Sequence, residues 1–437
     1  MSFVLFLLVN ATLFVRPGEI MPDLAPVPIY ECLILACLLT SLRTVMELLS
    51  WRRLVERPIA LGVLGMLAAI FLSHASHFDL WSARYDALNF LKTVIYFFLL
   101  LANVDSPGRM RVFLLWLLGC IGVTVCLALL QYHAWIDVAA LTALQQTEID
   151  PKTGMVYTFP RLRSTGIFND PNDLSMIAVA GIAIAAYFFT DRQAGFVRYM
   201  STAALAACGY ALLLTRSRGG LLALVASLSM LYQARYGWRK AMLVGAIVLP
   251  ALLLAAVGRQ ADIGGAMEEG TGQERIKLWS QGLSMLRGSP LFGIGQNHYA
   301  EEAGLVAHNS YIHCFGELGL FGGSIFLGLF FYAIRALYRL PVEELAELEP
   351  ETARLRPYLL AMASGCAASL LTISRPYTLP TYLTLGLAAS FLGQLEPALG
   401  MAEEPLGKQL IKHVAGAGLA MLAATYLFVR VFAHWGE

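Results

Sequence analysis

Long apolar runs recur along the whole chain and limit its fold more than any other feature. The thirteen runs are, in order, Phe3–Val15, Val27–Leu49, Ile59–Ser73, Leu88–Leu101, Val112–Tyr132, Leu174–Phe189, Met200–Leu214, Leu221–Tyr232, Ala241–Val257, Leu318–Ala336, Tyr358–Thr372, Tyr382–Leu395 and Val414–Phe432. Because lipid offers the backbone no hydrogen-bond partners, only helices and closed barrels cross a bilayer. The runs are continuous rather than strictly alternating, which indicates helices. We therefore expect an all-α polytopic membrane protein.

The composition supports this fold class. Of the 437 residues, 58% are hydrophobic and 14% are charged, whereas about 25% of the residues of a typical soluble domain are charged. A helix needs roughly 20 residues to cross the bilayer, so the length suits about 12 or 13 transmembrane helices. We expect them to form a single transmembrane domain over residues 1–437. The net charge of +1 gives no basic excess for a nucleic-acid partner.

Basic residues follow alternate runs and predict the orientation. Loops rich in arginine and lysine stay in the cytoplasm, and such loops follow the second, fourth, sixth, eighth and tenth runs. The N-terminus is then inside, and four other connections face outward: Ala134–Asp170, Thr215–Gly220, 258–307 and Ser374–Pro380. The longest polar insertions are 134–170 and 258–307, and long loops inside a compact fold are usually functional.

The 258–307 loop contains the pattern of an amphipathic helix. Thr271 and Glu274 form a capping box, and Gly288 ends the predicted helix. One face of it carries Ile276, Trp279, Leu283 and Leu286. We expect this helix to lie over the membrane surface and to carry part of an active site. A packed surface helix without a catalytic role is the alternative.

Arginines gather on the predicted outer face, where the orientation rule expects few of them. They are Arg161, Arg163, Arg216, Arg218, Arg275 and Arg375. Guanidinium groups pair with phosphate oxygens through two parallel hydrogen bonds. A lipid-linked diphosphate in the outer leaflet therefore suits this set. The alternative is that these side chains only snorkel or form structural ion pairs.

A histidine lies where the 258–307 loop meets the next apolar run. His308 and Asn309 begin this junction, and Gly319 and Gly322 follow after nine further residues. Imidazole can accept a proton near neutral pH, although a histidine at a helix start is often only structural. We expect Gly319 and Gly322 to form a small face on the tenth apolar helix, which would permit close helix contact.

Histidines and carboxylates near this junction also suggest a metal site as an alternative. The possible ligands are His298, His308, His313, Glu301, Glu302 and Glu317. Their spacing fits no short zinc motif, and no Asp-x-Asp pair is present there. We expect no metal and no other cofactor.

Four segments in this order resemble motifs of the bacterial O-antigen ligases, membrane glycosyltransferases of the O-antigen ligase and polymerase family. They are Arg163–Asp173 (RSTGIFNDPND), Leu214–Gly220 (LTRSRGG), Arg275–Trp279 with Ser289–Tyr299, and His308-Asn309 with Gly319 and Gly322. The first segment departs from the family's Asn-Pro-Asn pattern, because Asp170 precedes Pro171 and Asn172. The resemblance covers about residues 160–323, and the N-terminal third matches only in hydropathy.

The resemblance implies a function and a fold. The fold would be GT-C-like, in a multi-pass protein of the bacterial inner membrane with its active site facing the periplasm. The enzyme would transfer a glycan from undecaprenyl diphosphate to a lipid A–core hydroxyl in lipopolysaccharide biosynthesis, with inversion and without a metal. His308 would be catalytic, and Arg161, Arg163, Arg216, Arg218 and Arg275 would bind the diphosphate of the donor. Asn172, Asn309, Gly319 and Gly322 would support them.

Other functions remain open from sequence. An O-antigen polymerase would use a growing glycan as acceptor, and the His-Asn to Gly-x-x-Gly spacing favours a ligase. A protein O-oligosaccharyltransferase usually carries a larger periplasmic C-terminal domain, and none is expected after Phe432. A lipid-linked saccharide transporter or flippase would predict inverted repeats and charges at the membrane midplane, and the sequence pattern indicates neither.

Overall fold

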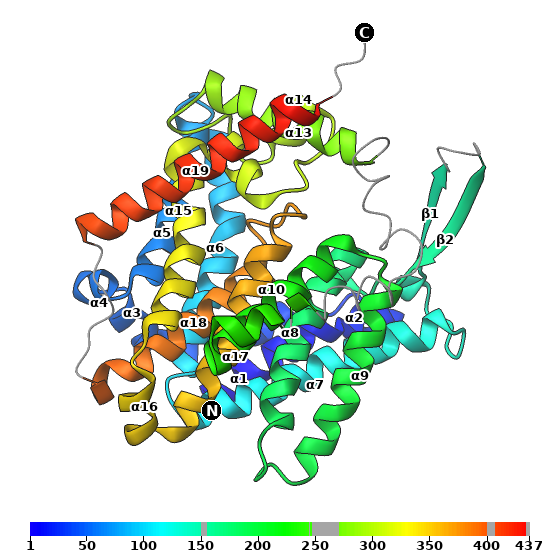
Figure 1. The fold of residues 1–437 in the computed structure, drawn as a ribbon, viewed down its shortest axis with the longest axis vertical. Coiled ribbons are helices and arrows are strands. Elements are labelled where there is room, and N and C mark those ends of the chain that lie inside the picture. Colours follow the sequence, from blue (N-terminus) through cyan, green and yellow to red (C-terminus); the bar gives the residue numbers. More distant parts are fainter. Residues whose placement is uncertain (150–154, 244, 247–270, 400–406, 434–437) are drawn as a thin grey trace. The chain divides into compact units, whose positions relative to one another are not determined.

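The computed structural model describes residues 1–149, 155–243, 245–246, 271–399 and 407–433. It consists mainly of long helices with one short hairpin (Figure 1). The chain divides into two compact units. The first unit contains Met1–Val45, Leu99–Ala261 and Leu340–Ser369, and the second contains Met46–Phe98, Asp262–Arg339 and Leu370–Glu437.

The first unit is built around α8 (Pro171–Phe189), which packs against α7, α9, α10 and α17. Its other elements are α1 (Ser2–Val15), α2 (Pro17–Ile20), η1 (Pro22–Leu24), α7 (Pro107–Tyr132), η2 (Ala139–Leu141), β1 (Leu144–Ile149), β2 (Val156–Arg161), η3 (Gly166–Phe168), α9 (Phe196–Leu214), α10 (Arg218–Tyr236), α16 (Val342–Leu348) and α17 (Pro350–Ser369). Nearly three quarters (72%) of an apolar 18-residue stretch of α8 is buried. The core of this unit therefore lies along α8.

The second unit is built around α15 (Ser310–Arg339), which packs against α5, α13, α18 and α19. The other elements are α4 (Trp51–Glu56), α5 (Pro58–Ala75), α13 (Thr271–Gly288), α14 (His298–Ala303), α18 (Leu379–Leu399) and α19 (Lys408–Phe432). Two further helices, α3 (Ile29–Leu48) and α6 (Leu80–Asn103), contribute to both units along the chain.

The predicted fold class is confirmed. Twelve of the thirteen apolar runs overlap described helices, and the remaining run, Ala241–Val257, lies largely outside the described residues. Nine helices in the described part of the chain are long and apolar enough to cross a membrane. The helices α10, α17 and α18 coincide with predicted runs and contain 19, 20 and 21 residues, but they are not among these nine. The molecule is an all-α polytopic membrane protein.

The 134–170 loop contains a hairpin that hydropathy did not predict. β1 and β2 pair antiparallel, from Leu144 opposite Arg161 to Ile149 opposite Val156. The Thr147 and Thr158 hydroxyls lie 3.1 Å apart across the strands. The hairpin delivers Arg161, its last residue, to the start of the following loop.

Candidate active site

The start of α10 has the geometry of an anion-binding helix terminus. Ser217 is the N-cap, and its hydroxyl oxygen accepts a hydrogen bond from the Gly220 N–H at 3.0 Å. Arg218 is the first helical residue, and Arg216 precedes the cap with a positive φ of 49°. A helix N-terminus leaves N–H groups unpaired and carries a partial positive charge. Two arginines are thus attached to a turn that attracts anions.

Arg161 and Asn172 hold this turn in place. The buried Arg161 guanidinium donates to the Thr215 carbonyl (2.8 Å), to Gln146 Oε1 (2.8 Å) and to Asn172 Oδ1 (3.2 Å). The Ser217 hydroxyl donates to the same Asn172 oxygen at 2.7 Å. One amide oxygen therefore joins the end of the hairpin, the start of α8 and the start of α10.

The other predicted arginines of the first unit are more accessible. Arg163 is half-buried and donates from Nε to the Thr142 carbonyl at 2.7 Å. Arg216 is also half-buried, and its guanidinium lies 4.7 Å from the centroid of the Phe159 ring. Arg218 is half-buried as well. The first unit thus contains four predicted arginines and Asn172. Arg161 is buried, whereas Arg163, Arg216 and Arg218 are half-buried.

In the second unit, α15 is broken at Gly319. This residue has φ 64° and ψ −164°, a conformation essentially restricted to glycine. A Cβ at Gly319 would lie 2.5 Å from the carbonyl carbon of Leu291, and one at Gly293 would lie 2.3 Å from that of Glu317. The prediction that Gly319 forms part of a smooth helix face is wrong, because another segment of backbone crosses the helix at this point.

The crossing segment replaces the hydrogen bonds that the break removes. The Gly316 and Glu317 carbonyls accept from the N–H groups of Ile294 (3.2 Å) and Gly295 (3.0 Å), and the Leu320 and Phe321 N–H groups donate to the carbonyls of Pro290 (2.8 Å) and Leu291 (3.1 Å). Buried backbone groups are costly to leave unpaired. The segment Pro290–Gly295 and the backbone of α15 around Gly319 are therefore joined by backbone hydrogen bonds on both sides of the break.

Gly322 lies where two helices approach each other. A Cβ added there would meet the Leu318 side chain of its own helix first, and it would lie 3.0 Å from the Cβ of Ala69 on α5. This glycine therefore allows α5 and α15 to approach closely, as expected for a small residue between membrane helices.

His308 and Asn309 lie at the start of α15. Asn309 Oδ1 accepts from the N–H groups of Tyr311 (3.0 Å) and Ile312 (3.2 Å), which caps the helix. His308 precedes the cap with a positive φ of 51° and is half-buried. The cap fixes the backbone beside the imidazole.

The predicted helix of the 258–307 loop is confirmed as α13, and it supports the His308 segment. It ends at Gly288 as expected, and Thr271 is its first described residue. The Trp279 indole N–H donates to the Ala307 carbonyl at 2.9 Å, directly before His308. Arg275 is half-buried one turn before Trp279, on the same side of α13. The helix packs against α15 and α19, so it is a packed element of this unit.

A buried carboxylate network lies one to two turns into α15. Glu317 is fully buried and accepts from the Tyr299 N–H (3.2 Å) and the Tyr377 hydroxyl (2.9 Å), while His313 Nε2 lies 3.1 Å away. The His313 ring stacks on Tyr299, with centroids 5.0 Å apart. Burial raises the pKa of Tyr377 well above its usual range, which keeps its phenol protonated as a donor. Sequence spacing revealed neither tyrosine, because both come from other segments.

Several of the possible metal ligands lie in pairs. His313 and Glu317 are paired with each other, and His298 lies 3.6 Å from Glu301. Within the described ranges, no group of three or more His, Cys, Asp or Glu side chains is placed to hold a metal ion.

Comparison with known protein families now bears on this site. The family model described as O-antigen ligase matches residues 202–327. Over this segment, which is less than a third of the 437 residues, the chain is similar to that family. No curated protein matches the chain.

The matched segment, 202–327, includes most of the predicted site residues. It contains the α10 start with Arg216 and Arg218, the helix α13 with Arg275, and the broken helix α15 with His308. Arg161, Arg163 and Asn172 precede it. This partial match supports a glycosyltransferase of ligase or polymerase type. Such chemistry needs cationic donors for a charged leaving group and a base for the acceptor hydroxyl.

Proposed function

We propose that this protein is an O-antigen ligase, which transfers a glycan from undecaprenyl diphosphate to a hydroxyl of lipid A–core. Attack of the hydroxyl on the anomeric carbon forms the new glycosidic bond and breaks the bond to diphosphate, with inversion. The observation that carries this proposal is the start of α15, where the Asn309 cap and the Trp279 contact hold His308 beside the helix terminus.

The arginines stabilise the leaving group in this proposal. Arg163, Arg216, Arg218 and Arg275 are half-buried, and we assign their guanidinium groups to pairing with diphosphate oxygens. Charge that develops on the diphosphate is then met by fixed cations, and no metal is required. Arg161 also belongs to the predicted donor-binding set. Because its guanidinium already donates to three protein acceptors, we assign it to positioning the turn before α10.

His308 accepts the proton of the acceptor hydroxyl as that hydroxyl attacks. Its backbone is held in a left-handed conformation that costs a non-glycine residue about 1–2 kcal/mol. Strain of this kind is often retained at functional residues. The surrounding hydrogen bonds to Ala307 and Asn309 maintain it.

The active site faces the periplasm of the inner membrane in this proposal. In a chain freed of its native cysteines, Gln281→Cys on α13 should react with an impermeant thiol reagent once the outer membrane is permeabilised. Glu347→Cys on α16 should not. Both positions are exposed, so access to the reagent decides the result. The reverse labelling pattern contradicts the orientation.

The transfer reaction is tested with purified protein in detergent, supplied with undecaprenyl diphosphate-linked glycan and lipid A–core. We expect glycan on lipid A–core without added metal, and no change on addition of a chelator. His308→Ala should abolish most of the product, whereas His133→Ala should not. His133 is a matched control because it is an exposed histidine bonded to Tyr210 in the first unit.

The same assay separates the alternative functions. A polymerase would lengthen the lipid-linked glycan and leave lipid A–core unmodified, and a flippase would make no product in detergent. Either result contradicts the ligase proposal. In a deletion strain, loss of long glycan from lipid A–core with accumulation of lipid-linked polymer would agree with it.

A further inference from the structure

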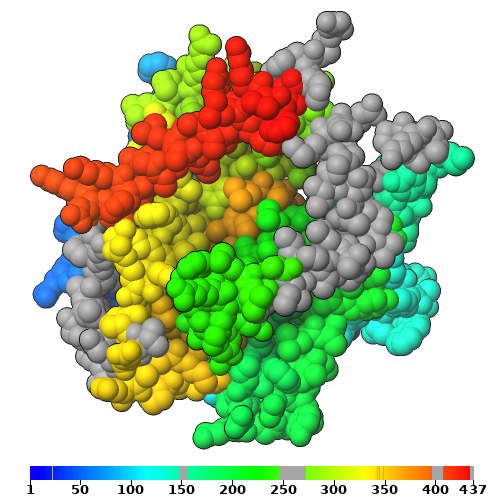
Figure 2. Space-filling model, viewed as in Figure 1, coloured from blue at the N-terminus to red at the C-terminus, as the bar shows by residue number. Residues whose placement is uncertain are grey.

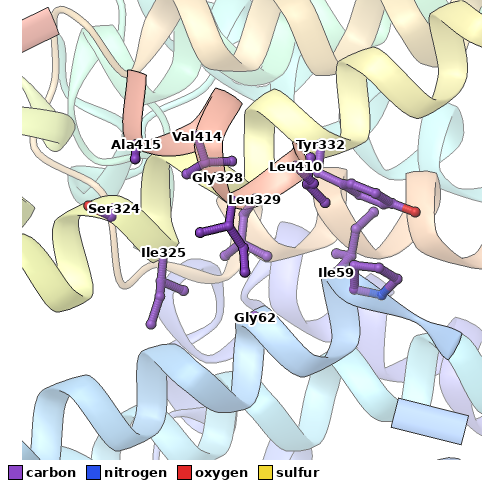
Figure 3. Close-up of a pocket in the computed structure, with 12 residues that line it drawn as sticks. Ile59, Gly62, Ser324, Ile325, Gly328, Leu329, Tyr332, Leu410, Val414 and Ala415 are labelled. Atoms are coloured by element: carbon purple, nitrogen blue, oxygen red, sulfur yellow. The ribbon is translucent and has the colours of Figure 1, made fainter. Parts of the chain in front are cut away.

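The second unit contains an apolar groove far along α15 from His308. It has a volume of about 370 Å³ and is lined by residues of α5, α15 and α19. Figure 3 shows Ile325 and Leu329 of α15 and Val414 of α19 around the space next to Gly62 of α5. Specific ligand pockets commonly begin at about 300 Å³. The groove is therefore large enough to hold part of a ligand.

Two glycines shape the groove. A Cβ at Gly328 would lie 3.1 Å from Val414 Cγ1, and a Cβ at Gly62 would lie 2.7 Å from Leu329 Cδ2. Larger residues at these positions would press on the walls. The outer wall is α19, in which only 11% of the apolar 18-residue stretch is buried. Figure 2 shows this helix uncovered on the surface. The groove thus opens beside a mostly exposed helix that is long and apolar enough to cross a membrane.

The position of the groove along its helices assigns it to one leaflet. Its lining residues come from the first turns of α5 and α19, Pro58–Gly62 and Leu410–Ala415, and from the C-terminal half of α15, 324–332. These ends are cytoplasmic in the orientation proposed above. The inference rests on that orientation and not on the transfer reaction.

Basic side chains gather at this end of the groove. Arg335 lies one turn after the lining residue Tyr332, and it donates to His413 Nδ1 on α19 at 3.3 Å. Lys408 and Lys412 are exposed on α19, four residues apart and therefore on one side of the helix. Basic pockets at the cytoplasmic ends of membrane helices attract anionic lipid headgroups.

We infer that the groove binds an acyl chain of an anionic phospholipid of the cytoplasmic leaflet, with its phosphate beside Arg335 and Lys412. The apolar walls exclude a charged or sugar ligand from the interior, because burying such groups without partners is costly. The basic end selects an anionic headgroup over a zwitterionic one. The bound lipid is separate from the glycan donor, which the proposed function places at the opposite membrane face.

The test uses phosphatidylglycerol with a photoactivatable diazirine in its acyl chain, in vesicles of phosphatidylcholine that contain the full-length protein. Illumination should label the peptides that contain 324–332 and 410–415. Unlabelled phosphatidylglycerol should compete, and phosphatidylcholine should not. Ala415→Trp, which fills the groove, should remove this labelling. Ala420→Trp should not, because Ala420 is exposed and, five residues on, faces another side of the same helix.

A charge variant tests the headgroup separately from the groove. Lys412→Gln should weaken competition by phosphatidylglycerol roughly fivefold, since one basic group near a membrane surface contributes about 1 kcal/mol to anionic lipid binding. Lys240→Gln removes one exposed charge just after α10, at the same predicted membrane face, and should have no effect. Equal competition by phosphatidylcholine, or labelling unchanged in Ala415→Trp, would mean ordinary annular lipid and would overturn the inference. Neither readout depends on glycan transfer.

Discussion

The starts of α10 and α15 share one backbone design but present different chemistry. In each, a residue with positive φ precedes a polar N-cap, Arg216 (φ 49°) before Ser217 and His308 (φ 51°) before Asn309. At α10 the capping side chain also bonds to Asn172, and arginines flank it. At α15 the capping amide oxygen accepts from two backbone N–H groups, and an imidazole stands before it.

In our proposal, this difference adapts the two helix termini to two tasks. Positive φ alone does not mark function, because Arg16, Phe78, Ala134 and Asn297 share it in the described part of the chain. The arginine-flanked terminus suits binding of a charged group, and the terminus with one imidazole suits proton transfer. Substitutions at the two termini should therefore affect binding and turnover differently.

The largest expected effect is at the α15 start. General-base catalysis contributes about 10²–10⁴-fold to rate, so His308→Ala should lower the transfer rate by roughly that factor. Binding of the lipid-linked donor should stay nearly unchanged, because diphosphate contacts belong to the arginines in our proposal. Single-turnover transfer and donor binding are measured on the same purified variant. Normal transfer in a folded His308→Ala protein contradicts the general-base role, and lost donor binding would move His308 to the binding set.

The second largest effect is expected at Gly319, where α15 is broken; α10 has no such break. Gly319→Ala forces a Cβ to within 2.5 Å of Leu291 and into a backbone conformation that alanine avoids. We expect the free energy of unfolding to fall by about 3 kcal/mol or more. Thermal unfolding in detergent measures this loss. Gly288→Ala is the control, because no atom lies within 4 Å of its added Cβ, and equal stability of the two variants would refute the interlocked arrangement.

Hydropathy predicted most of the fold because each membrane helix satisfies its own backbone and is long and apolar by itself. The end of α13 at Gly288 was also predicted from local signals. The hairpin of β1 and β2 was not, since two short strands obtain their hydrogen bonds only from each other. Its weak signal is the β-favouring sequence of Val156–Phe159.

The candidate site was predicted where its residues are adjacent in sequence. His308 with Asn309, and Arg216 with Arg218, each lie on one turn. The role of Gly319 was predicted wrongly, because its φ depends on the segment 290–295 that crosses it. The buried network of Glu317 joins Tyr299 and Tyr377, which are 18 and 60 residues away in the chain. No local pattern reports such a contact.

The third effect is at the α10 start. Arg218→Lys keeps the charge but loses the planar fork that pairs with two phosphate oxygens. A hydrogen bond to a charged group contributes about 1.5–3 kcal/mol, so transfer should fall roughly 10- to 100-fold, with weaker donor binding. Arg109→Lys, in an exposed pair with Asp105, is the matched control. Unchanged donor binding in the Arg218 variant would leave this arginine only a structural role.

The smallest effect compares the two caps directly. Ser217→Ala and Asn309→Ala each remove a side-chain oxygen that accepts from helix N–H groups, and loss of such a cap costs about 0.5–2 kcal/mol. Ser217→Ala should cost more, because it also removes the donor to Asn172 and thereby loosens the contact with Arg161. Replacing Ser217 with Thr retains both hydrogen bonds and should restore most of the stability. Thermal unfolding of the four proteins, wild type included, measures the order. If Asn309→Ala proves the more costly change, the Asn172 junction contributes little, and the two helix starts are stabilised by their caps alone.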